Sequence, residues 1–337
     1  MGTIADVESY LSAFSNGVHE SEARELVQKL KTQETARQDH AAWAKAQKAR
    51  TIAEVTSYQS SFTNGLHLAE ASTLLKQLVD EAETSHKPQA GKPWTNTLGM
   101  AFAPVPLSNV LFCIWETRVQ DYEAFMRATN RAQFTTNQNW EKAYFTQGPT
   151  HPAVNVSWDD AQAFCRWLTA HERGAGRLGT NQSYRLPTDA EWSVAVGLPK
   201  ESGSTPQDKD MKIAAVYPWG TTWPPPKGAG NYADETTGKK YGKSFRIIAG
   251  YDDGFAQTAP VGSFKPNQFG LCDLAGNAWE WCEDFYDGKS GDRVLRGASW
   301  FLSDRGNLWS SRRSNGVPAY RSDHIGFRCV LGVSSAP

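Results

Sequence analysis

The stretch RVLRGASWFLSDRGNLWSSRRSNGVPAYRSDHIGFRCV, residues 293–330, decides how the C-terminal part of this chain folds. Its two ends, 293–296 and 325–330, are apolar and typical of buried strand. The middle is rich in Ser, Asn, Gly, Asp and Pro, which favour irregular backbone. Large apolar side chains interrupt that middle: Phe301, Leu302, Trp309 and Tyr320. Stiff ends around a chemically mixed middle predict a binding surface held on a rigid scaffold.

The composition of the whole chain limits what else it can be. With 337 residues, two domains are expected. Lys and Arg number 35 against 36 Asp and Glu, so neither nucleic acid nor an anionic membrane is indicated as a partner. No apolar run approaches the roughly 20 residues of a membrane helix, and no apolar signal segment opens the chain. A cytoplasmic location is the simplest expectation, with export or surface display left open.

The five cysteines are spread widely and form no CxxC pair, which argues against a zinc ribbon. Free thiols of this kind usually serve as small buried apolar groups. The 13 tryptophans predict large cores or contact surfaces, because indole is bulky and carries one hydrogen-bond donor.

Residues 3–30 and 51–78 are the same unit repeated at a constant offset of 48 residues. The sequence TIADVESYLSAFSNGVHESEARELVQKL aligns with TIAEVTSYQSSFTNGLHLAEASTLLKQL. Thr3 and Thr51 are placed to cap a helix, and the Asn-Gly pair that follows is expected to end it with a left-handed turn. Apolar residues at helical spacing then resume, and residues 31–50 are expected to continue as a connecting helix.

Each unit resembles the tetratricopeptide-like hairpins found beside bacterial sensor and effector domains. Two units make a small all-α module, residues 1–84, which either docks a protein partner or acts as a spacer. Residues 85–99 are expected to be a linker, because SHKPQAGKPW at 85–94 is polar and contains Pro and Gly.

After residue 100 the pattern changes to short apolar runs separated by Gly-rich segments. Residues 110–115 read as a buried strand. Capping boxes at Ser157 with Asp160, and at Thr188 with Glu191, predict the starts of two helices. Residues 198–250 are polar and rich in Gly and Pro, and so much irregular chain inside a domain is usually functional or held by an ion.

Several motifs now stand in order: HPAVNVSWDDAQAFCRWL, YRLPTDAEW, YPWG, NQFGLCDLAGNAWEWCEDFY, RVLRGASW and IGFRCV. Together they resemble the formylglycine-generating enzyme (sulfatase-modifying factor) family, a variant of the C-type lectin fold. The resemblance implies that residues 100–337 form an α+β domain with a small antiparallel sheet and two helices. The fold class is therefore α+β, preceded by the all-α helical-hairpin repeats.

The resemblance also implies two structural calcium sites. The first would use Asn231, the carbonyl of Tyr232, Asp253 and the carbonyl of Phe255. The second would use Asp273, the carbonyls of Leu274, Gly276 and Ala278, and Glu280. Carboxylates mixed with carbonyls suit a hard cation. The alternatives are a plain turn at Asp253 and a buried ion pair at Glu280.

The copper chemistry of the family is not expected here. The family's two thiolates match Leu302 and Asn307, and neither side chain offers the soft sulfur that selects Cu(I). Ser299 then reads as a turn hydroxyl. The seven histidines contain no His-x3-His-x-Glu spacing of the family's iron-dependent branch. We therefore predict a protein that is not an enzyme and binds no copper.

The loop between RVLRGASW and IGFR also resembles that of the variable proteins of diversity-generating retroelements. In those proteins an Asn-rich template is rewritten at adenines, so Asn codons give many other residues. Positions 301–324 form the variable loop region of this resemblance, framed by Arg305, Arg313, Pro318 and Arg321. The candidate ligand-binding residues are Phe301, Leu302, Ser303, Asp304, Asn307, Trp309, Ser314, Asn315, Gly316, Val317, Ala319, Tyr320, Ser322, Asp323 and His324.

These observations favour a non-catalytic, receptor-like protein that binds an unknown ligand, expected to be a protein, through residues 301–324. Aromatic residues would supply rigid contact area and polar residues would supply hydrogen bonds. The alternatives are a copper-dependent oxidase of the formylglycine-generating type and a degenerate accessory signalling module that acts through the repeats. A second reading of Trp309 and Tyr320, as core residues, also stays open.

Overall fold

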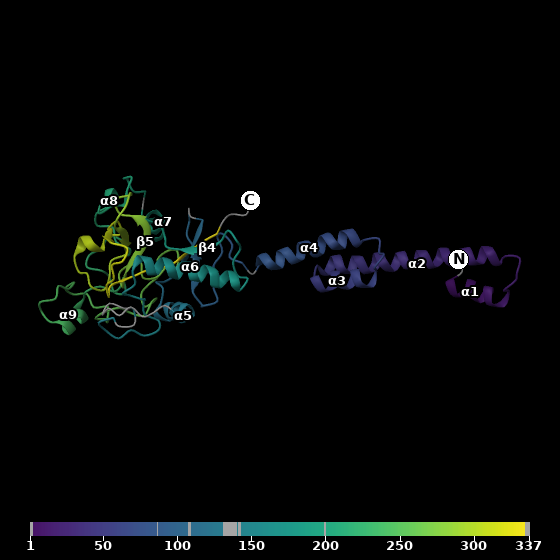
Figure 1. The fold of residues 1–337 in the computed structure, drawn as a ribbon, viewed down its shortest axis with the longest axis horizontal. Coiled ribbons are helices and arrows are strands. Elements are labelled where there is room, and N and C mark those ends of the chain that lie inside the picture. The colour runs from purple at the N-terminus through teal and green to yellow at the C-terminus, as the bar shows by residue number, and fades with distance from the viewer. Residues whose placement is uncertain are drawn as a thin grey trace. The chain divides into compact units, whose positions relative to one another are not determined.

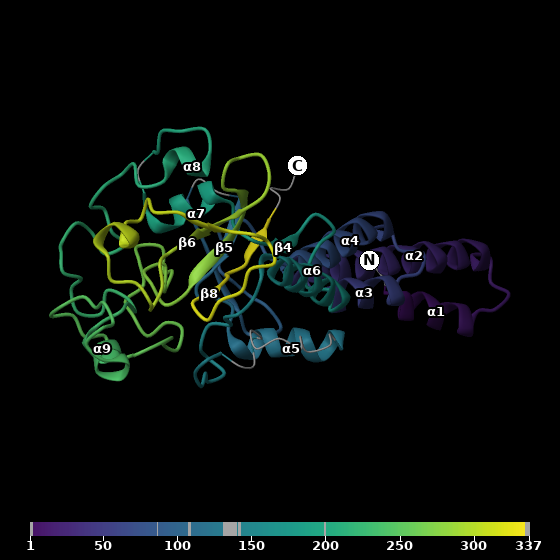
Figure 2. The same cartoon turned by 60° about the vertical axis from the view of Figure 1, so that its left-hand side comes forward.

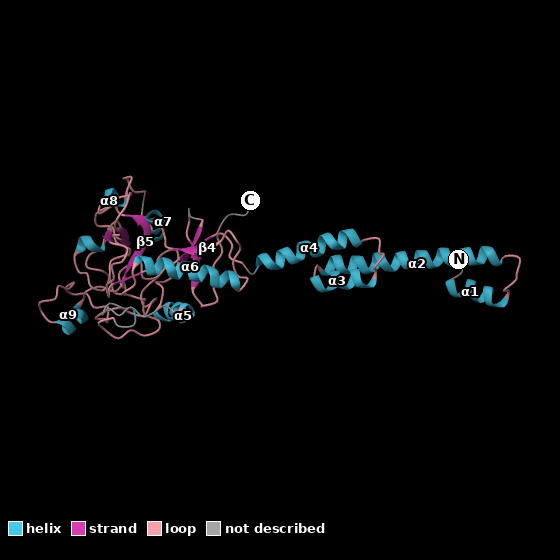
Figure 3. Cartoon of the chain, viewed as in Figure 1, coloured by secondary structure: helices cyan, strands magenta, loops and turns pink. Residues whose placement is uncertain are grey.

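The structure is a computed structural model that describes residues 3–85, 87–106, 109–130, 140, 143–198 and 200–333. Parts of the predicted domains, including 1–2 and 334–337, lie outside the described residues. The chain divides into two compact units, residues 1–86 and 87–337. Figure 3 shows helices dominating the first unit and loops dominating the second.

The N-terminal unit consists of helical hairpins. Its helices are α1 (Ile4–Ala13), α2 (Glu20–Ala49), α3 (Ile52–Ser61) and α4 (Leu68–Ser85). Thr3 and Thr51 cap α1 and α3, each by accepting a hydrogen bond from the backbone N–H three residues on. The expected connecting helix is the second half of α2, which runs unbroken past α1 and on to α3 (Figure 1).

The predicted left-handed turn at Asn-Gly is wrong. The helices end at Phe14 and Phe62 with φ of −132° and −124°, and neither Gly17 nor Gly65 has a positive φ. Space explains the glycines instead. A Cβ on Gly65 would lie 2.7 Å from the Tyr58 hydroxyl oxygen and 2.9 Å from the Phe62 Cβ, closer than non-bonded atoms approach.

The C-terminal unit contains two small sheets. The first has the strand order β1-β2-β3-β9-β4, and every pairing is antiparallel. Its strands are β1 (Trp94–Thr95), β2 (Ala101–Pro104), β3 (Val110–Cys113), β4 (Ser183–Arg185) and β9 (Val330–Gly332). All residues of β3 are buried, as the sequence predicts. Strand β1 lies within the expected linker 85–99, so only the first part of that segment connects the units.

The second sheet has the order β7-β6-β5-β8 and pairs β5 with β8 in parallel. Its strands are β5 (Trp279–Phe285), β6 (Arg293–Arg296), β7 (Ser314–Gly316) and β8 (Ile325–Gly326), three of which Figure 2 labels side by side. The expected single antiparallel sheet is therefore two sheets, one of them mixed.

The predicted strand at 325–330 is also divided. It begins as β8 in the second sheet and ends at the start of β9 in the first. Phe327, Arg328 and Cys329, between the two strands, have no exposed surface. The end of the 293–330 stretch is thus fixed in both sheets, a tertiary arrangement that local apolar pattern does not specify.

Helices cover the sheets, and their starts follow the sequence signals. They are α5 (Val119–Thr129), α6 (Trp158–Gly174), α7 (Asp189–Val196), and the short α8 (Pro206–Lys209) and α9 (Glu235–Tyr241). Both predicted capping boxes, at Ser157 and Thr188, are formed. All five cysteines are free thiols; four are buried, and the Cys165 and Cys329 sulfur atoms lie 3.5 Å apart.

Candidate binding surface

The chain between β6 and β8 mixes buried residues with an outward-facing set. Of the four predicted frame residues only Arg313 is buried, whereas Arg305 is exposed and Pro318 and Arg321 are half-buried. None of the fifteen predicted ligand-binding residues is buried. Six are exposed: Phe301, Asp304, Asn315, Val317, Ala319 and Tyr320. Nine are half-buried: Leu302, Ser303, Asn307, Trp309, Ser314, Gly316, Ser322, Asp323 and His324. The buried residues between them are Leu308, Ser310, Ser311 and Arg313.

Two of the aromatic residues differ in burial. Tyr320 is 45% exposed, which excludes its reading as a core residue. Trp309 is half-buried and packs on the main core, and its buried indole N–H has no partner among the described residues. Leu302 packs on the same core. Trp309 and Leu302 therefore present only part of their side chains outward.

The middle of the loop is fixed by a buried ion-pair network. Arg313 donates to both carboxylate oxygens of Asp189 at 3.0 Å, and to both of Glu201 at 2.5 and 2.7 Å. Arg296, on β6, also pairs with Asp189 and donates to the Ser310 carbonyl at 2.8 Å. Asp189, the first residue of α7, thus ties the strand before the loop to the loop's centre.

Charge is balanced in this network, which we call the Arg313 clamp (Arg296, Arg313, Asp189 and Glu201). Burial by itself would raise the pKa of Asp189, but the attraction and hydrogen bonds of the two arginines hold that pKa below its ordinary value. Burial lowers the pKa of Arg296, although Asp189 opposes the shift. Removing one partner would leave a buried charge uncompensated, so the clamp holds as a unit.

A second buried pair fixes the end of the loop. Arg328, after β8, donates to Glu280 on β5 at 2.6 to 2.9 Å, and neither side chain is exposed. The same guanidinium donates to the carbonyls of Cys113 and Cys272 at 3.1 and 2.8 Å. These bonds join both sheets beneath the surface.

The outward-facing set is brought together around His324. The His324 ring stacks on Phe301 with centroids 5.4 Å apart, and Phe301 meets Trp300 edge-on. His324 also lines a hollow of about 320 Å³, which is otherwise lined by Trp279, Leu295, Ser314, Asn315, Gly316, Val317, Tyr320 and Ile325. The first and last residues of the predicted region thus share one surface. Asp304, Asn307 and Trp309 do not line this hollow.

The sequence reasoning missed aromatic residues that come from outside residues 301–324. Phe245 packs edge-on against Phe301, with centroids 5.2 Å apart, and Tyr241 at the end of α9 stacks on Trp300. Tyr241 is 40% exposed. Their only sequence signal was two aromatic residues in a polar, Gly-rich segment, which gives no hint of a contact across some 60 residues.

The residues of the first predicted calcium site offer oxygen donors of the kind that calcium binds. Asp253 accepts the N–H groups of Tyr232 and Phe255, both at 2.9 Å. Burial raises the pKa of Asp253 to about 8, and the Asn231 Oδ1 is buried with no partner among the described residues. A carboxylate that burial makes hard to ionise, beside an unsatisfied amide oxygen, fits a bound cation.

The second predicted site fits less well. Glu280 is fully engaged by Arg328 and by the Trp192 indole N–H at 2.9 Å, which favours its reading as a buried ion pair. One buried carboxylate oxygen of Asp273 has no partner within the described ranges, and burial raises the pKa of Asp273 to about 6. Gly276 lies directly against Asn231, so the two predicted sites adjoin.

Among the described residues, no three His, Cys, Asp or Glu side chains are grouped to hold a metal. A site on the family pattern uses mainly carbonyl and amide oxygens, so the two predicted calcium sites do not depend on such a group. The residues at the two copper-thiolate positions, Leu302 and Asn307, are both half-buried. Ser299 is buried, and its hydroxyl has no hydrogen-bond partner in the described part of the chain.

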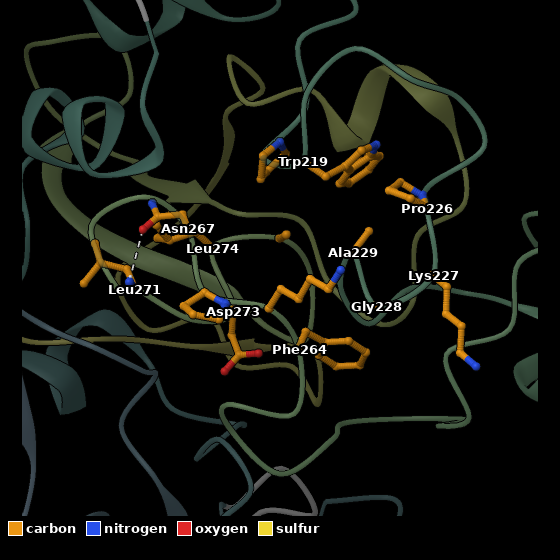
Figure 4. Close-up of a pocket in the computed structure, with 14 residues that line it drawn as sticks. Trp219, Pro226, Lys227, Gly228, Ala229, Phe264, Asn267, Leu271, Asp273 and Leu274 are labelled. Carbon is orange, nitrogen blue, oxygen red and sulfur yellow. Dashed lines mark hydrogen bonds between the residues drawn. The ribbon is translucent and has the colours of Figure 1, made fainter.

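A separate cavity of about 280 Å³ lies outside the loop region (Figure 4). Trp219, Phe264 and Pro226 line it, together with Asp273 and Leu274 from the second predicted calcium segment. None of the fifteen predicted ligand-binding residues lines this cavity. The part of the chain that the structure describes contains no helix long and apolar enough to cross a membrane.

The C-terminal unit is a mostly irregular α+β domain in which two short sheets hold a long loop. This arrangement places the unit in the class of lectin-like folds. Residues 101–333 match the sulfatase-modifying factor enzyme 1-like domain. The chain belongs to this family, which confirms the resemblance seen in the motifs.

Relatives in this family include both active and inactive proteins. Inactive C-alpha-formylglycine-generating enzyme 2 of Bos taurus is 36% identical over 192 residues, 55% of this chain and 52% of that protein. Formylglycine-generating enzyme of Streptomyces coelicolor is 33% identical over 202 residues, 55% of this chain and 54% of that protein. The chain spans about half the length of these curated relatives.

The solved structure of Treponema denticola variable protein 1 aligns with a TM-score of 0.46 at 21% identity, covering 72% of this chain and 99% of that chain.

Proposed function

We propose that this protein is a non-catalytic binding protein whose outward-facing residues between 301 and 324 recognise a protein ligand and are diversified by a retroelement. One observation carries the proposal. Every one of the fifteen candidate residues has exposed surface, whereas Arg313, Leu308 and most residues of the two flanking motifs are buried. Such a division lets the sequence of the surface change without removing core contacts.

The chemistry of the surface supports a protein ligand. Phe301, Tyr320 and Val317 are 45%, 45% and 54% exposed. Together they place apolar surface in contact with water within an otherwise polar loop. Asp304 and Asn315 add exposed polar groups. Rigid aromatic rings combined with adaptable polar groups are typical of diversified binding surfaces.

Sequencing the gene from independent isolates tests the diversification. We expect substitutions to concentrate at the fifteen outward-facing positions and to spare Arg296, Arg313 and Arg328. Substitutions spread evenly over residues 100–333 would contradict the proposal. A reverse-transcriptase gene next to an Asn-codon-rich near-copy of the coding sequence for 293–330 would support it independently.

The alternative is an oxidase of the formylglycine-generating type, an activity that some relatives carry in their names. Against it stand Leu302 and Asn307, which replace the two thiolates that Cu(I) chemistry requires. We expect no oxygen uptake when the copper-treated protein is mixed with a Cys-containing peptide. Turnover above a metal-free control would favour the enzyme.

We further propose that calcium supports the frame through Asn231, Tyr232, Asp253 and Phe255. Its role would be structural, because none of these residues lines the hollow beside His324, and the next residue, Ala233, donates its N–H to the Leu302 carbonyl at 3.0 Å. The second set, at 273–280, is the weaker candidate since Arg328 already neutralises Glu280.

A further inference from the structure

Each helical repeat has a groove between its two helices. A further helix of the chain occupies the groove of the second repeat, and the groove of the first repeat is open. In the second repeat, the C-terminal part of α2 lies against α3 and α4. Trp43 and Ala46 pack there with Val55, Tyr58 and Ala71 in a single core cluster. This packing buries Val55 and Ala71 completely.

Polar groups fix the position of this helix. Asp39 accepts a hydrogen bond from the Tyr58 hydroxyl at 2.5 Å and one from the Leu66 backbone N–H at 2.6 Å. Trp43 stacks on the ring of His67 with centroids 5.8 Å apart. The helix in the groove is therefore recognised through three of its own residues: an Asp, a Trp four residues later and an Ala three residues after that. All three lie on one face of the helix.

The first repeat has the same groove with nothing in it. Counting back 48 residues from the second repeat gives Val7, Tyr10, His19, Ala23 and Leu26. These residues, with Asp6 and Glu22, line an open groove of about 410 Å³. Leu26 is 45% exposed, whereas its counterpart Leu74 packs on the core of the second repeat.

Within the described part of the chain, two polar groups of the first repeat are free as well, although Asp6, His19 and Glu22 in the groove are hydrogen-bonded. Among the described residues, the Tyr10 hydroxyl and the Val18 backbone N–H have no hydrogen-bond partner, although their counterparts at 58 and 66 both bind Asp39. No described residue takes the place that Asp39 and Trp43 take in the second repeat, because the first groove is open and Leu26 on its wall is exposed.

We infer that the groove of the first repeat binds a helix of a protein partner that carries the pattern Asp-x3-Trp-x2-Ala. The Asp would accept hydrogen bonds from the Tyr10 hydroxyl and the Val18 N–H. The Trp would cover Val7, Tyr10 and Ala23 and stack on His19. This inference concerns the N-terminal unit and does not depend on the function proposed for residues 301–324.

The chain itself supplies the probe. A labelled peptide with the sequence of residues 35–49, TARQDHAAWAKAQKA, is titrated with the full-length protein and followed by fluorescence anisotropy. We expect saturable binding that weakens at least about tenfold when the peptide carries Trp43→Ala or Asp39→Ala, since each removes an anchoring group. Hydrogen exchange of the Val18 amide should slow when the unmodified peptide is bound.

Variants of the protein locate the site. Leu26→Glu places a charge on the groove wall and should weaken peptide binding by about tenfold or more, while Gln28→Glu, on the exposed side of the same helix, should leave it unchanged. Because neither residue is buried, circular dichroism should show intact helices for both.

Three outcomes would overturn the inference. One is the absence of saturable binding at millimolar peptide, and another is equal binding by the Leu26→Glu and Gln28→Glu proteins. The third is a dimer, seen by sedimentation, that Leu26→Glu dissociates, because the occupant would then be a second copy of this chain.

Discussion

Within residues 293–330, the buried frame and the outward-facing surface alternate along the chain, yet they obey opposite physical demands. The frame carries full charges, at Arg296, Arg313 and Arg328, that have no exposed surface at all. The surface carries apolar groups, Phe301 and Val317, that remain in contact with water. Burial here does not follow polarity alone, because buried ion pairs hold the loop together with the apolar packing of Leu302, Leu308 and Trp309.

This contrast separates two energetic regimes. Breaking a buried ion pair costs about 3–5 kcal/mol, whereas exposed substitutions usually stay within about 0.5 kcal/mol. Set against a typical stability of about 5–15 kcal/mol, a change in the frame threatens folding and a change on the surface does not. The experiments below test that separation, starting with the largest expected effect.

Arg313→Met should destabilise the protein most, because it removes the guanidinium that pairs with both Asp189 and Glu201. The substitution leaves Asp189 and Glu201 buried without their shared partner, and we expect a loss of about 3–5 kcal/mol in the free energy of unfolding, measured by urea denaturation. Arg312→Met is the matched control. Arg312 is 25% exposed and pairs with a single acidic side chain, Asp210, among the residues that the structure describes, so a loss nearer 1 kcal/mol is expected. Equal losses would remove the distinction between frame and surface.

The same pair of proteins gives a pH test. The folded-state pKa of Asp189 lies below its ordinary 3.8, so the stability it contributes is present above pH 3.8 and is lost as the pH falls through the folded-state value. Burial by itself would raise the pKa of Glu201, but Arg313 likewise holds that pKa below its ordinary 4.5. The stability gap between the wild type and Arg313→Met should therefore be constant near neutral pH and narrow as the pH falls below about 4.5. A gap that widens on acidification would contradict the assignment of the clamp.

Calcium should strengthen the frame if Asp253 and its neighbours hold it. At a hundred times the dissociation constant, a bound ion adds about 2.7 kcal/mol to the stability, which thermal melting in calcium against chelator would detect. Asp253→Asn should abolish the increase. Asp252→Asn, next to it but exposed, should retain the increase, and a calcium effect that survives Asp253→Asn would exclude the first predicted site.

Gly316→Val should reveal one outward-facing position that cannot vary freely. A Cβ there would lie 3.0 Å from the Trp281 ring and 3.4 Å from Tyr320, so we expect a loss of about 1–3 kcal/mol from crowding. Ala319→Val, on an exposed neighbour, should change stability by less than about 0.5 kcal/mol. Natural isolates with large residues at 316 and unchanged melting temperature would show that Trp281 moves aside.

The smallest effect on stability should come from the surface itself. Replacing Phe301, Asp304, Val317 and Tyr320 together by Ala should shift the free energy of unfolding by no more than about 2 kcal/mol, the sum of four exposed changes. The far-ultraviolet circular dichroism should remain that of the wild type. A loss as large as that of Arg313→Met would mean that these side chains belong to the core.

Some of this protein could be predicted from local signals. The cap at Thr3 and the capping boxes at Ser157 and Thr188 depend on residues three apart, so they formed where the sequence placed them. The burial of Val110–Cys113 and the start of β6 at Arg293 follow from apolar pattern over a few residues. The glycines of the two repeats were found but misexplained, because only the folded hairpin shows how closely Tyr58 approaches Gly65.

The sequence by itself determined the family and the repeats, because each of these depends on motif order or on neighbours along the chain. Only the tertiary structure decided what clamps the loop and what joins it. Arg313 meets Asp189 across 124 residues, and Phe245 meets Phe301 from a segment with no local pattern of its own. Such partners meet because the fold brings them close in space. The sequence pattern around a residue does not specify which distant charge or ring will contact that residue.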